Sequence, residues 1–199
     1  MIPFPNYADL LWLGRYVAHA FLSAGMDVSR EFSPQMPEPP ARFGGVKGFS
    51  SWLEQYWPPV TLHSYKKVIS TALQRLVDDG VAYAEVSFDY HDALSMGLSI
   101  EDWGRLIRSQ HAPFTEKLAL CPEFGINREE DPEKSLRQLE TAMKTGVFRS
   151  IDLYGDELAR PVREFRRIYQ VAAAAKLKRK AHLGEFGTAA DVKEGVEVL

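Results

Sequence analysis

The 199-residue sequence predicts an α/β fold, specifically a partial (β/α)8 barrel of parallel strands preceded by an N-terminal helical segment. Four times along the chain, a stretch with helical periodicity is followed by a short run rich in β-branched and aromatic residues. Each of these four runs ends in polar or charged residues. Alternation of helices and strands requires a parallel sheet, because parallel neighbours are joined by long crossovers that are usually helical.

The composition fits one globular domain, with 45% hydrophobic and 26% charged residues. We therefore assign residues 1–199 to a single partial barrel domain. Apolar residues at helical spacing predict a first helix over residues 7–24. Residues 33–48 are predicted to form a loop, because they are rich in proline, which lacks a backbone N–H, and in glycine, which is conformationally free.

Four helix–strand pairs are expected in the rest of the chain. In the first pair, a helix over residues 63–79 stops at Gly80, and a strand follows over residues 81–89. The other three pairs are helix 100–117 with strand 118–129, helix 132–144 with strand 148–157, and helix 162–176 with strand 178–187.

Charge and cysteine content restrict the classes of partner and compartment. The formal net charge of -3 gives no reason to expect a nucleic-acid partner, and the basic run at residues 176–180 is interpreted as a solvated approach to a strand. The single cysteine, Cys121, excludes an intramolecular disulfide and favours a reducing, cytoplasmic setting. No apolar run reaches the length of a membrane span, and the N-terminal residues lack a signal-peptide pattern.

The carboxyl ends of the expected strands carry the candidate site residues, because in barrels and open parallel sheets these ends face the site. His182 and Glu185 lie three residues apart at the end of the last strand. The imidazole could bind zinc and the carboxylate could carry a proton. The alternative is a histidine hydrogen-bonded in the core beside an exposed glutamate.

The segment "IDLYGDE", residues 151–157, is the second candidate. Asp152 lies within an apolar run, where a carboxylate is costly unless it is paired, and Gly155 would let the backbone approach a ligand closely. The alternative is a turn in which Asp156 and Glu157 cap the next helix. The other histidines, His19, His63, His91 and His111, have no partner at metal-ligand spacing and are interpreted as surface or packing residues.

Together these segments resemble the adenosine deaminase family, zinc-dependent barrel enzymes that convert a purine amino group to an oxo group. The resemblance runs from about residue 43 to residue 199 and rests on "DDGVAYAEVSFD", "FGINRE", "IDLYGDE" and "AHLGEFG". It implies that His182 is a zinc ligand, Glu185 the proton donor to the purine ring, and Gly155 a backbone contact to the purine. Asp152, in the same segment as Gly155, is the other candidate substrate-binding residue.

The sequence departs from the family at both ends of the match. The family opens with a His-x-His pair on its first strand, whereas the first forty residues here contain one histidine, His19. The family also continues through three more strands after the His-x-x-Glu strand. We therefore expect a fragment with an incomplete metal site that binds zinc weakly or not at all, and an open sheet that self-associates through its edges. The alternative is a non-catalytic partial barrel that binds a purine-like ligand or a partner protein.

Overall fold

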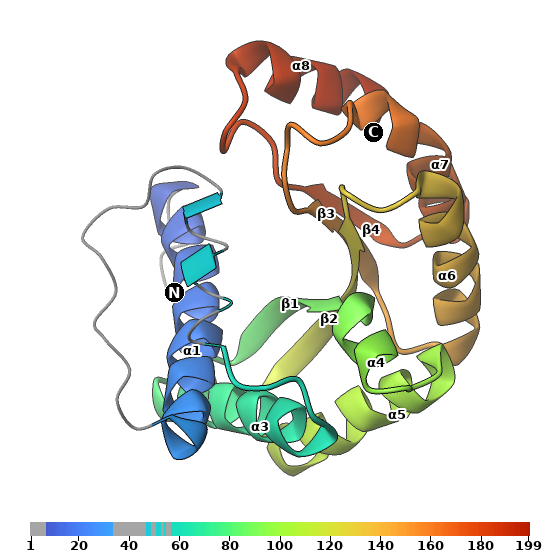
Figure 1. Ribbon diagram of the computed structural model, residues 1–199. Coiled ribbons are helices and arrows are strands. Elements are labelled where there is room, and N and C mark those ends of the chain that lie inside the picture. The colour runs from blue at the N-terminus through green and yellow to red at the C-terminus, as the bar shows by residue number, and fades with distance from the viewer. Residues whose placement is uncertain (1–6, 34–46, 49–50, 53, 55–56) are drawn as a thin grey trace, which may run out of the picture.

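The fold is known from a computed structural model, which describes residues 7–33, 47, 48, 51, 52, 54 and 57–199. The described residues form an α/β structure built on a four-stranded parallel sheet with the order β1-β2-β3-β4 (Figure 1). Neighbours in the sheet are consecutive in sequence, as in a barrel. The strands are β1 (Tyr83–Asp89), β2 (Ala119–Asn127), β3 (Ser150–Tyr154) and β4 (Lys178–Ala181).

Helices follow the outer, convex side of the curved sheet, and α1 lies against α3 at one end of it (Figure 1). The α-helices are α1 (Tyr7–Phe32), α3 (Leu62–Asp78), α4 (Tyr90–Ser95), α5 (Ile100–His111), α6 (Pro132–Thr145), α7 (Arg166–Ala174) and α8 (Ala189–Val198). Two 3-10 helices, η1 (Ala112–Phe114) and η2 (Val162–Phe165), precede β2 and α7. None of the helices in the described part combines the length and apolar character needed to cross a membrane.

The outer face of the sheet is apolar and buried beneath the helices. Trp103 of α5 is fully buried, and its ring centroid lies 4.9 Å from that of Phe148 and 6.0 Å from that of Phe124. Its indole N–H donates to the Tyr65 hydroxyl of α3 at 3.0 Å, so the one polar atom of this side chain is satisfied. The strand residues buried on this face are Ala84, Val86, Phe88, Phe124, Ile126, Ile151 and Leu153.

The inner, concave face of the sheet is polar. In the strand register, Glu123 of β2 pairs with Ser87 of β1 and with Ser150 of β3. Ser150 pairs in turn with Lys178 of β4. The alternation of an apolar outer set with a polar inner set is expected for strands of a barrel wall. The predicted partial (β/α)8 barrel is therefore confirmed, and β1 and β4 are the edges of the sheet within the described residues.

Several of the predicted element boundaries were wrong. The strand predicted over residues 178–187 ends at Ala181, and the strand predicted over residues 148–157 covers only Ser150–Tyr154. The first helix does not end at residue 24 but continues to Phe32; Gly25 lies inside it, and its missing side chain leaves room for Trp57, since a Cβ on Gly25 would lie 2.4 Å from the Trp57 ring. The helix predicted over residues 100–117 ends at His111, since Pro113 lacks the N–H that an α-helix needs. The helix predicted from residue 162 begins as η2.

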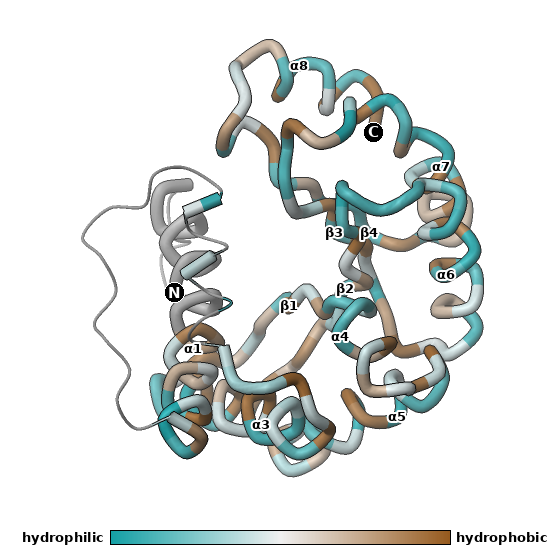
Figure 2. Tube along the Cα trace, viewed as in Figure 1, coloured by the Kyte–Doolittle hydropathy of each residue, from teal (hydrophilic) through white to brown (hydrophobic). Residues whose placement is uncertain are grey.

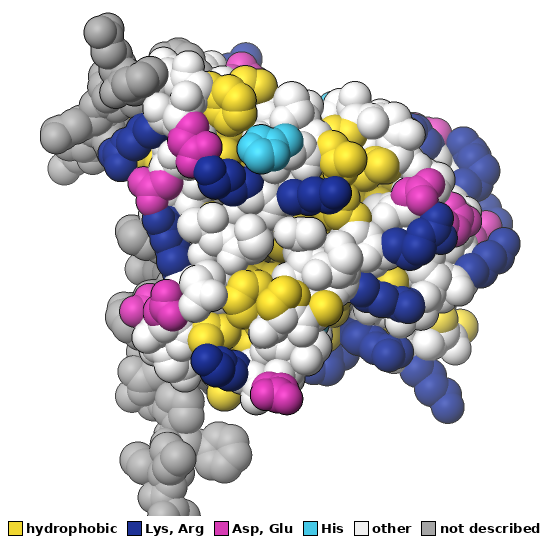
Figure 3. All heavy atoms as spheres, turned by 90° about the horizontal axis from the view of Figure 1, so that it is seen from below, with side chains coloured by type: hydrophobic (Ala, Val, Ile, Leu, Met, Phe, Trp, Pro, Cys, Tyr) yellow, Lys and Arg dark blue, Asp and Glu magenta, His cyan; other side chains and the backbone are white. Residues whose placement is uncertain are grey.

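The solvent-facing surfaces are mixed in character. The connection from β2 to α6 is hydrophilic along its length (Figure 2). Seen from below, where α3 and α5 lie, side chains of both charge signs are scattered among apolar ones (Figure 3). The loop predicted over residues 33–48 falls mostly on residues 34–46, which lie outside the described residues.

Candidate active site

The four parallel strands bring the predicted site segments to one end of the sheet, where the carboxyl ends of the strands lie. Asp89 closes β1, Asn127 closes β2, the 155–157 segment follows β3, and the 182–185 segment follows β4. Because all four strands run in the same direction, their carboxyl ends meet at one mouth. The segments that sequence analysis selected therefore share a single region of the molecule.

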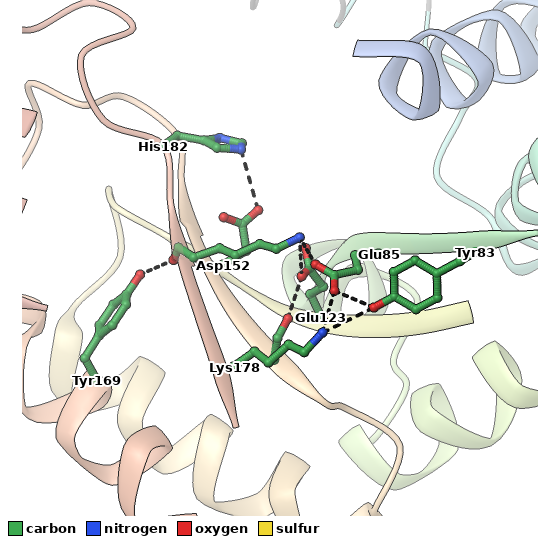
Figure 4. Close-up of polar contacts among 9 residues, drawn as sticks. Tyr83, Glu85, Glu123, Asp152, Tyr169, Lys178 and His182 are labelled. Carbon is green, nitrogen blue, oxygen red and sulfur yellow. Dashed lines mark hydrogen bonds and ion pairs between the residues drawn. The ribbon is translucent and has the colours of Figure 1, made fainter. Parts of the chain in front are cut away.

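His182 and Asp152 are adjacent at this mouth (Figure 4). The His182 Nε2 atom lies 3.7 Å from Asp152 Oδ2, and the His182 backbone N–H donates to Leu153 O at 2.8 Å, which extends the β3–β4 pairing past β4. The His182 side chain is 56% exposed, so the alternative of a core histidine is wrong. Its imidazole faces the mouth.

The Asp152 carboxylate is buried, and one of its two oxygen atoms accepts no hydrogen bond from the described residues. The residue is 3% exposed, and its Oδ1 atom has no hydrogen-bond partner among the described residues. A buried acceptor without a partner costs about 1–3 kcal/mol. Such an atom is suited to receive a hydrogen bond from a ligand that enters the mouth.

Gly155 occupies a position that only glycine fills without strain. Its φ of +97° lies in the left-handed region, and a Cβ there would lie 2.6 Å from the Asn127 side-chain oxygen. Asp156 accepts from the Leu158 N–H, which confirms the turn. The predicted helix caps at Asp156 and Glu157 were wrong, because the next helix, η2, follows Pro161 without a side-chain cap, and the Glu157 carboxylate accepts hydrogen bonds from the 184–187 segment.

Glu185 lies in that same segment, three residues after His182, and is exposed to solvent. The preceding Gly184 has a φ of +76°, and a Cβ on it would lie 2.6 Å from a Val192 methyl group. The backbone therefore turns sharply between the candidate metal ligand and the candidate proton donor. The carboxylate of Glu185 is presented at the surface of this turn.

Below the mouth lies a charged cluster that sequence analysis missed. Glu85, Glu123 and Lys178 belong to it (Figure 4), and Lys180 forms ion pairs with both glutamates. Lys180 Nζ lies 2.9 Å from Glu123 and also contacts Glu85, while Lys178 Nζ lies 2.8 Å from Glu85. Lysines of β4 thus reach Glu85 on β1, the other edge strand, across the concave face. Residues 178–180 are exposed, as expected for a solvated run, but the interpretation missed that Lys178 and Lys180 form ion pairs across the concave face.

The pKa values in this cluster follow from burial and pairing. Burial alone would raise the pKa of Glu85, but hydrogen bonds from Lys178, Lys180 and Tyr83 lower it to about 2. Burial raises the pKa of Glu123, which is 3% exposed, and hydrogen bonds from Ser150 and Lys180 offset part of this rise. The signal for the cluster was present as period-two alternation in "YAEVSFD", which places Tyr83, Glu85, Ser87 and Asp89 on one face.

A mostly apolar cavity of about 200 Å³ lies beside the carboxyl end of β1, between α1 and α3. Phe21, Trp57 and Phe88 contribute to its walls, and two carboxylates, Asp89 and Asp92, contribute to its lining. Burial raises the pKa of Asp92 to about 6, with a further contribution from the nearby Asp89 carboxylate. Sequence analysis assigned no role to Asp92.

The described residues do not fit a catalytic zinc. Such an ion takes about three protein ligands, and no group of three or more His, Cys, Asp or Glu side chains is placed to hold a metal in the part of the chain that the structure covers. His182 and Asp152 supply two candidate donors. His111 instead contacts Leu118 O at 2.7 Å, His91 lies 3.8 Å from Glu130, and the His19 side chain is outside the described residues.

The sequence model of the adenosine deaminase family matches residues 46–199. The chain belongs to the adenosine deaminase family. An adenine deaminase of Streptomyces coelicolor is 32% identical over 147 residues, which is 70% of this chain and 42% of that protein. A Treponema pallidum protein named as an adenosine/adenine deaminase is 25% identical over 82% of this chain and 56% of its own length. The chain spans about half the length of the curated relatives it matches.

Solved structures share the fold. The adenine deaminase of Arthrobacter aurescens superposes with a TM-score of 0.73 at 20% identity, over 90% of this chain and 60% of that one. A zinc-bound amidohydrolase of Burkhoderia ambifaria gives a TM-score of 0.69 at 20% identity, over 89% of this chain and 54% of that one. At this level of identity the likeness concerns the fold alone, and it supports the partial barrel.

Proposed function

We propose that this chain contributes the His-x-x-Glu half of an active site that hydrolyses the amino group of a purine base or nucleoside. The observation that carries the proposal is the 3.7 Å approach of His182 to the buried Asp152 at the shared carboxyl ends of β3 and β4. Both residues lie in segments that match the adenosine deaminase family. Gly155 and Glu185 follow the same two strands.

In the proposed reaction, water replaces the amino group of the purine, and ammonia leaves. Glu185 delivers a proton to the ring nitrogen next to the amino-bearing carbon, the role of a general acid. Asp152 offers an unused oxygen to a donor group of the ligand or orients the His182 ring. Gly155, which carries no side chain, lets the backbone after β3 approach the flat face or edge of the ring.

Zinc is the cofactor that family membership suggests, with His182 as its one candidate imidazole ligand. The described residues supply fewer donors than a catalytic zinc requires, so no step is assigned to the metal here. We expect the chain on its own to bind zinc weakly and to show little turnover. Loss of several direct ligands should exceed the 10–100-fold effect of changing one outer-shell partner.

The small number of metal-ligand side chains among the described residues favours a second candidate, a partial barrel that binds a purine-like ligand or a partner protein without turnover. The test uses the folded chain, His182→Ala, Asp152→Asn and the control His63→Ala, which alters an exposed histidine on α3. Turnover of adenine and adenosine is followed by ultraviolet absorbance with zinc added and then chelated. Binding of the same purines is followed by saturation-transfer NMR.

Purine binding that is weakened in His182→Ala and Asp152→Asn, but not in His63→Ala, would support the site. Chelator-sensitive turnover lost in His182→Ala would favour the deaminase over the non-catalytic candidate, and would show that further ligands are supplied. Folded protein that neither binds nor converts any aminated purine would contradict the proposal.

A further inference from the structure

The Glu157 carboxylate makes three hydrogen bonds to the segment that carries the candidate catalytic residues. Oε1 accepts from the Gly184 N–H at 2.5 Å, and Oε2 accepts from the Phe186 and Gly187 N–H groups, each at 3.0 Å. Glu157 itself is 7% exposed and follows β3. A side chain from one strand end thus holds the backbone that leaves the next strand.

The backbone of the 184–187 segment is shaped around this carboxylate. N–H groups that converge in a turn form a concavity that binds anions, and here the anion is supplied by the chain itself. Gly187 approaches so closely that a Cβ would lie 3.0 Å from Glu157 Oε1, and Gly184 has a positive φ. A side chain at position 187 would crowd the carboxylate, and one at position 184 would strain the backbone.

Arg128 extends the contact to a third strand end. Its Nη1 donates to Glu157 O at 2.7 Å, and its own backbone N–H donates to Tyr154 O at 2.8 Å. The residue is 3% exposed, and its positive charge lies close enough to act on the Glu157 carboxyl group. Residues after β2, β3 and β4 are consequently joined through Glu157.

We propose that Glu157 is a positioning residue: its ionised carboxylate fixes the turn after β4 and so sets where the Glu185 side chain stands relative to His182. Glu185 lies between two residues, Gly184 and Phe186, whose N–H groups are both bonded to Glu157. Fixing the backbone on both sides leaves side-chain rotation as the main freedom of the Glu185 carboxylate. Its use in proton transfer rests on the proposed function, whereas the fixing of the turn does not.

The ionisation state of Glu157 agrees with this role. Burial alone would raise the pKa of its carboxyl group, but the three backbone N–H donors and the nearby Arg128 lower it below the ordinary value. A carboxylate that accepts several backbone hydrogen bonds is stabilised in its charged form. The turn is therefore held throughout the neutral range and is released only when acid protonates Glu157.

The test compares the folded, isotope-labelled chain with Glu157→Gln, which keeps the shape of the side chain but replaces one acceptor oxygen with a donor. The matched control is Asp156→Asn, because the Asp156 carboxylate accepts only from the Leu158 N–H among the described residues. Hydrogen exchange should accelerate by about 10-fold or more at the Gly184, Phe186 and Gly187 amides in Glu157→Gln. Exchange at β1 and β2 amides should not change.

A pH titration of the amide proton shifts distinguishes direct bonding by the Glu157 carboxylate from a general effect on stability. In the wild-type chain, the three amide proton shifts should titrate together, at a pKa below the ordinary 4.5 of a glutamate, and this titration should vanish in Glu157→Gln. Unchanged exchange at these amides, or acceleration spread equally over the whole protein, would overturn the proposal. If the amides respond as expected and the folded wild-type chain neither binds nor converts an aminated purine, the proposed function fails while the positioning of the turn stands.

Discussion

Replacement of Lys180 by methionine should destabilise the protein at neutral pH, because it removes the cation that neutralises Glu123. Methionine keeps most of the length and apolar character of the lysine stem, so the change is mainly one of charge. The Lys180 ammonium lies 2.9 Å from Glu123, whose side chain is 4% exposed. Glu85 retains its contact with Lys178 at 2.8 Å.

The expected magnitude follows from the burial of the carboxylate left behind. Removal of one partner from a fully buried pair costs about 3–5 kcal/mol. Here the Lys180 side chain is 42% exposed and Ser150 still donates to Glu123 at 2.5 Å, so water and one hydrogen bond remain. We therefore expect a loss of about 2 kcal/mol in the free energy of unfolding.

The sign of the pH dependence is set by Glu123. Burial already raises its folded-state pKa, and loss of Lys180 raises it further. The penalty is present at pH values where the unpaired carboxylate is charged, and it disappears as the pH falls through this raised pKa. The wild-type and variant proteins should thus converge in stability when the pH is lowered from a neutral value to an acidic value below the raised pKa of Glu123.

Urea unfolding followed by circular dichroism measures the effect at both pH values. Lys176→Met is the matched control, since Lys176 is exposed, forms no ion pair with the described residues and undergoes the same change of charge. A difference from the control within about 0.5 kcal/mol at neutral pH would refute the reasoning. A penalty that is equally large at both pH values would also refute it, because packing rather than charge would then be its cause.

Three further predictions concern the inner face, the site and the sheet edges. The pKa of Glu85 is about 2 in the folded protein, against 4.5 ordinarily, so its charged form stabilises the fold above about pH 4.5 and this contribution is lost toward pH 2. Solvent screening limits the contribution to about 1–2 kcal/mol. Urea unfolding of Glu85→Gln should therefore show a flatter acid limb than wild type, and equal slopes would contradict the pairing. Gly155→Ala should lower the unfolding free energy by about 1–3 kcal/mol, through its positive φ and the clash with Asn127, and an unchanged melting temperature would exclude that strain. The edges at β1 and β4, which are unpaired among the described residues, should cause concentration-dependent self-association in light scattering, and a monomer at every concentration would show that the edges are protected.

Much of the fold could be predicted because its signals are local. Helical periodicity and β-branched runs identified all four helix–strand pairs, and strand direction followed from the length of the crossovers. His182, Asp152 and Gly155 could be chosen because polar residues at the ends of parallel strands meet in space. The boundaries were less predictable: Gly25, a residue that weakens helices, lies inside α1 and packs against Trp57, a contact that helical periodicity does not reveal.

The sequence by itself determined the order of helices and strands, the family, and which segments meet at the mouth, since these depend on neighbouring residues and on short motifs. Only the tertiary structure decided that Lys178 and Lys180 face Glu85, 93 residues away for the Lys178 contact, and that Glu157 holds the turn after β4. The physical reason is that sheet curvature sets which inner-face side chains can reach each other across the barrel. The residues next to a charged side chain in the sequence do not indicate which distant side chain the curved sheet will place beside it.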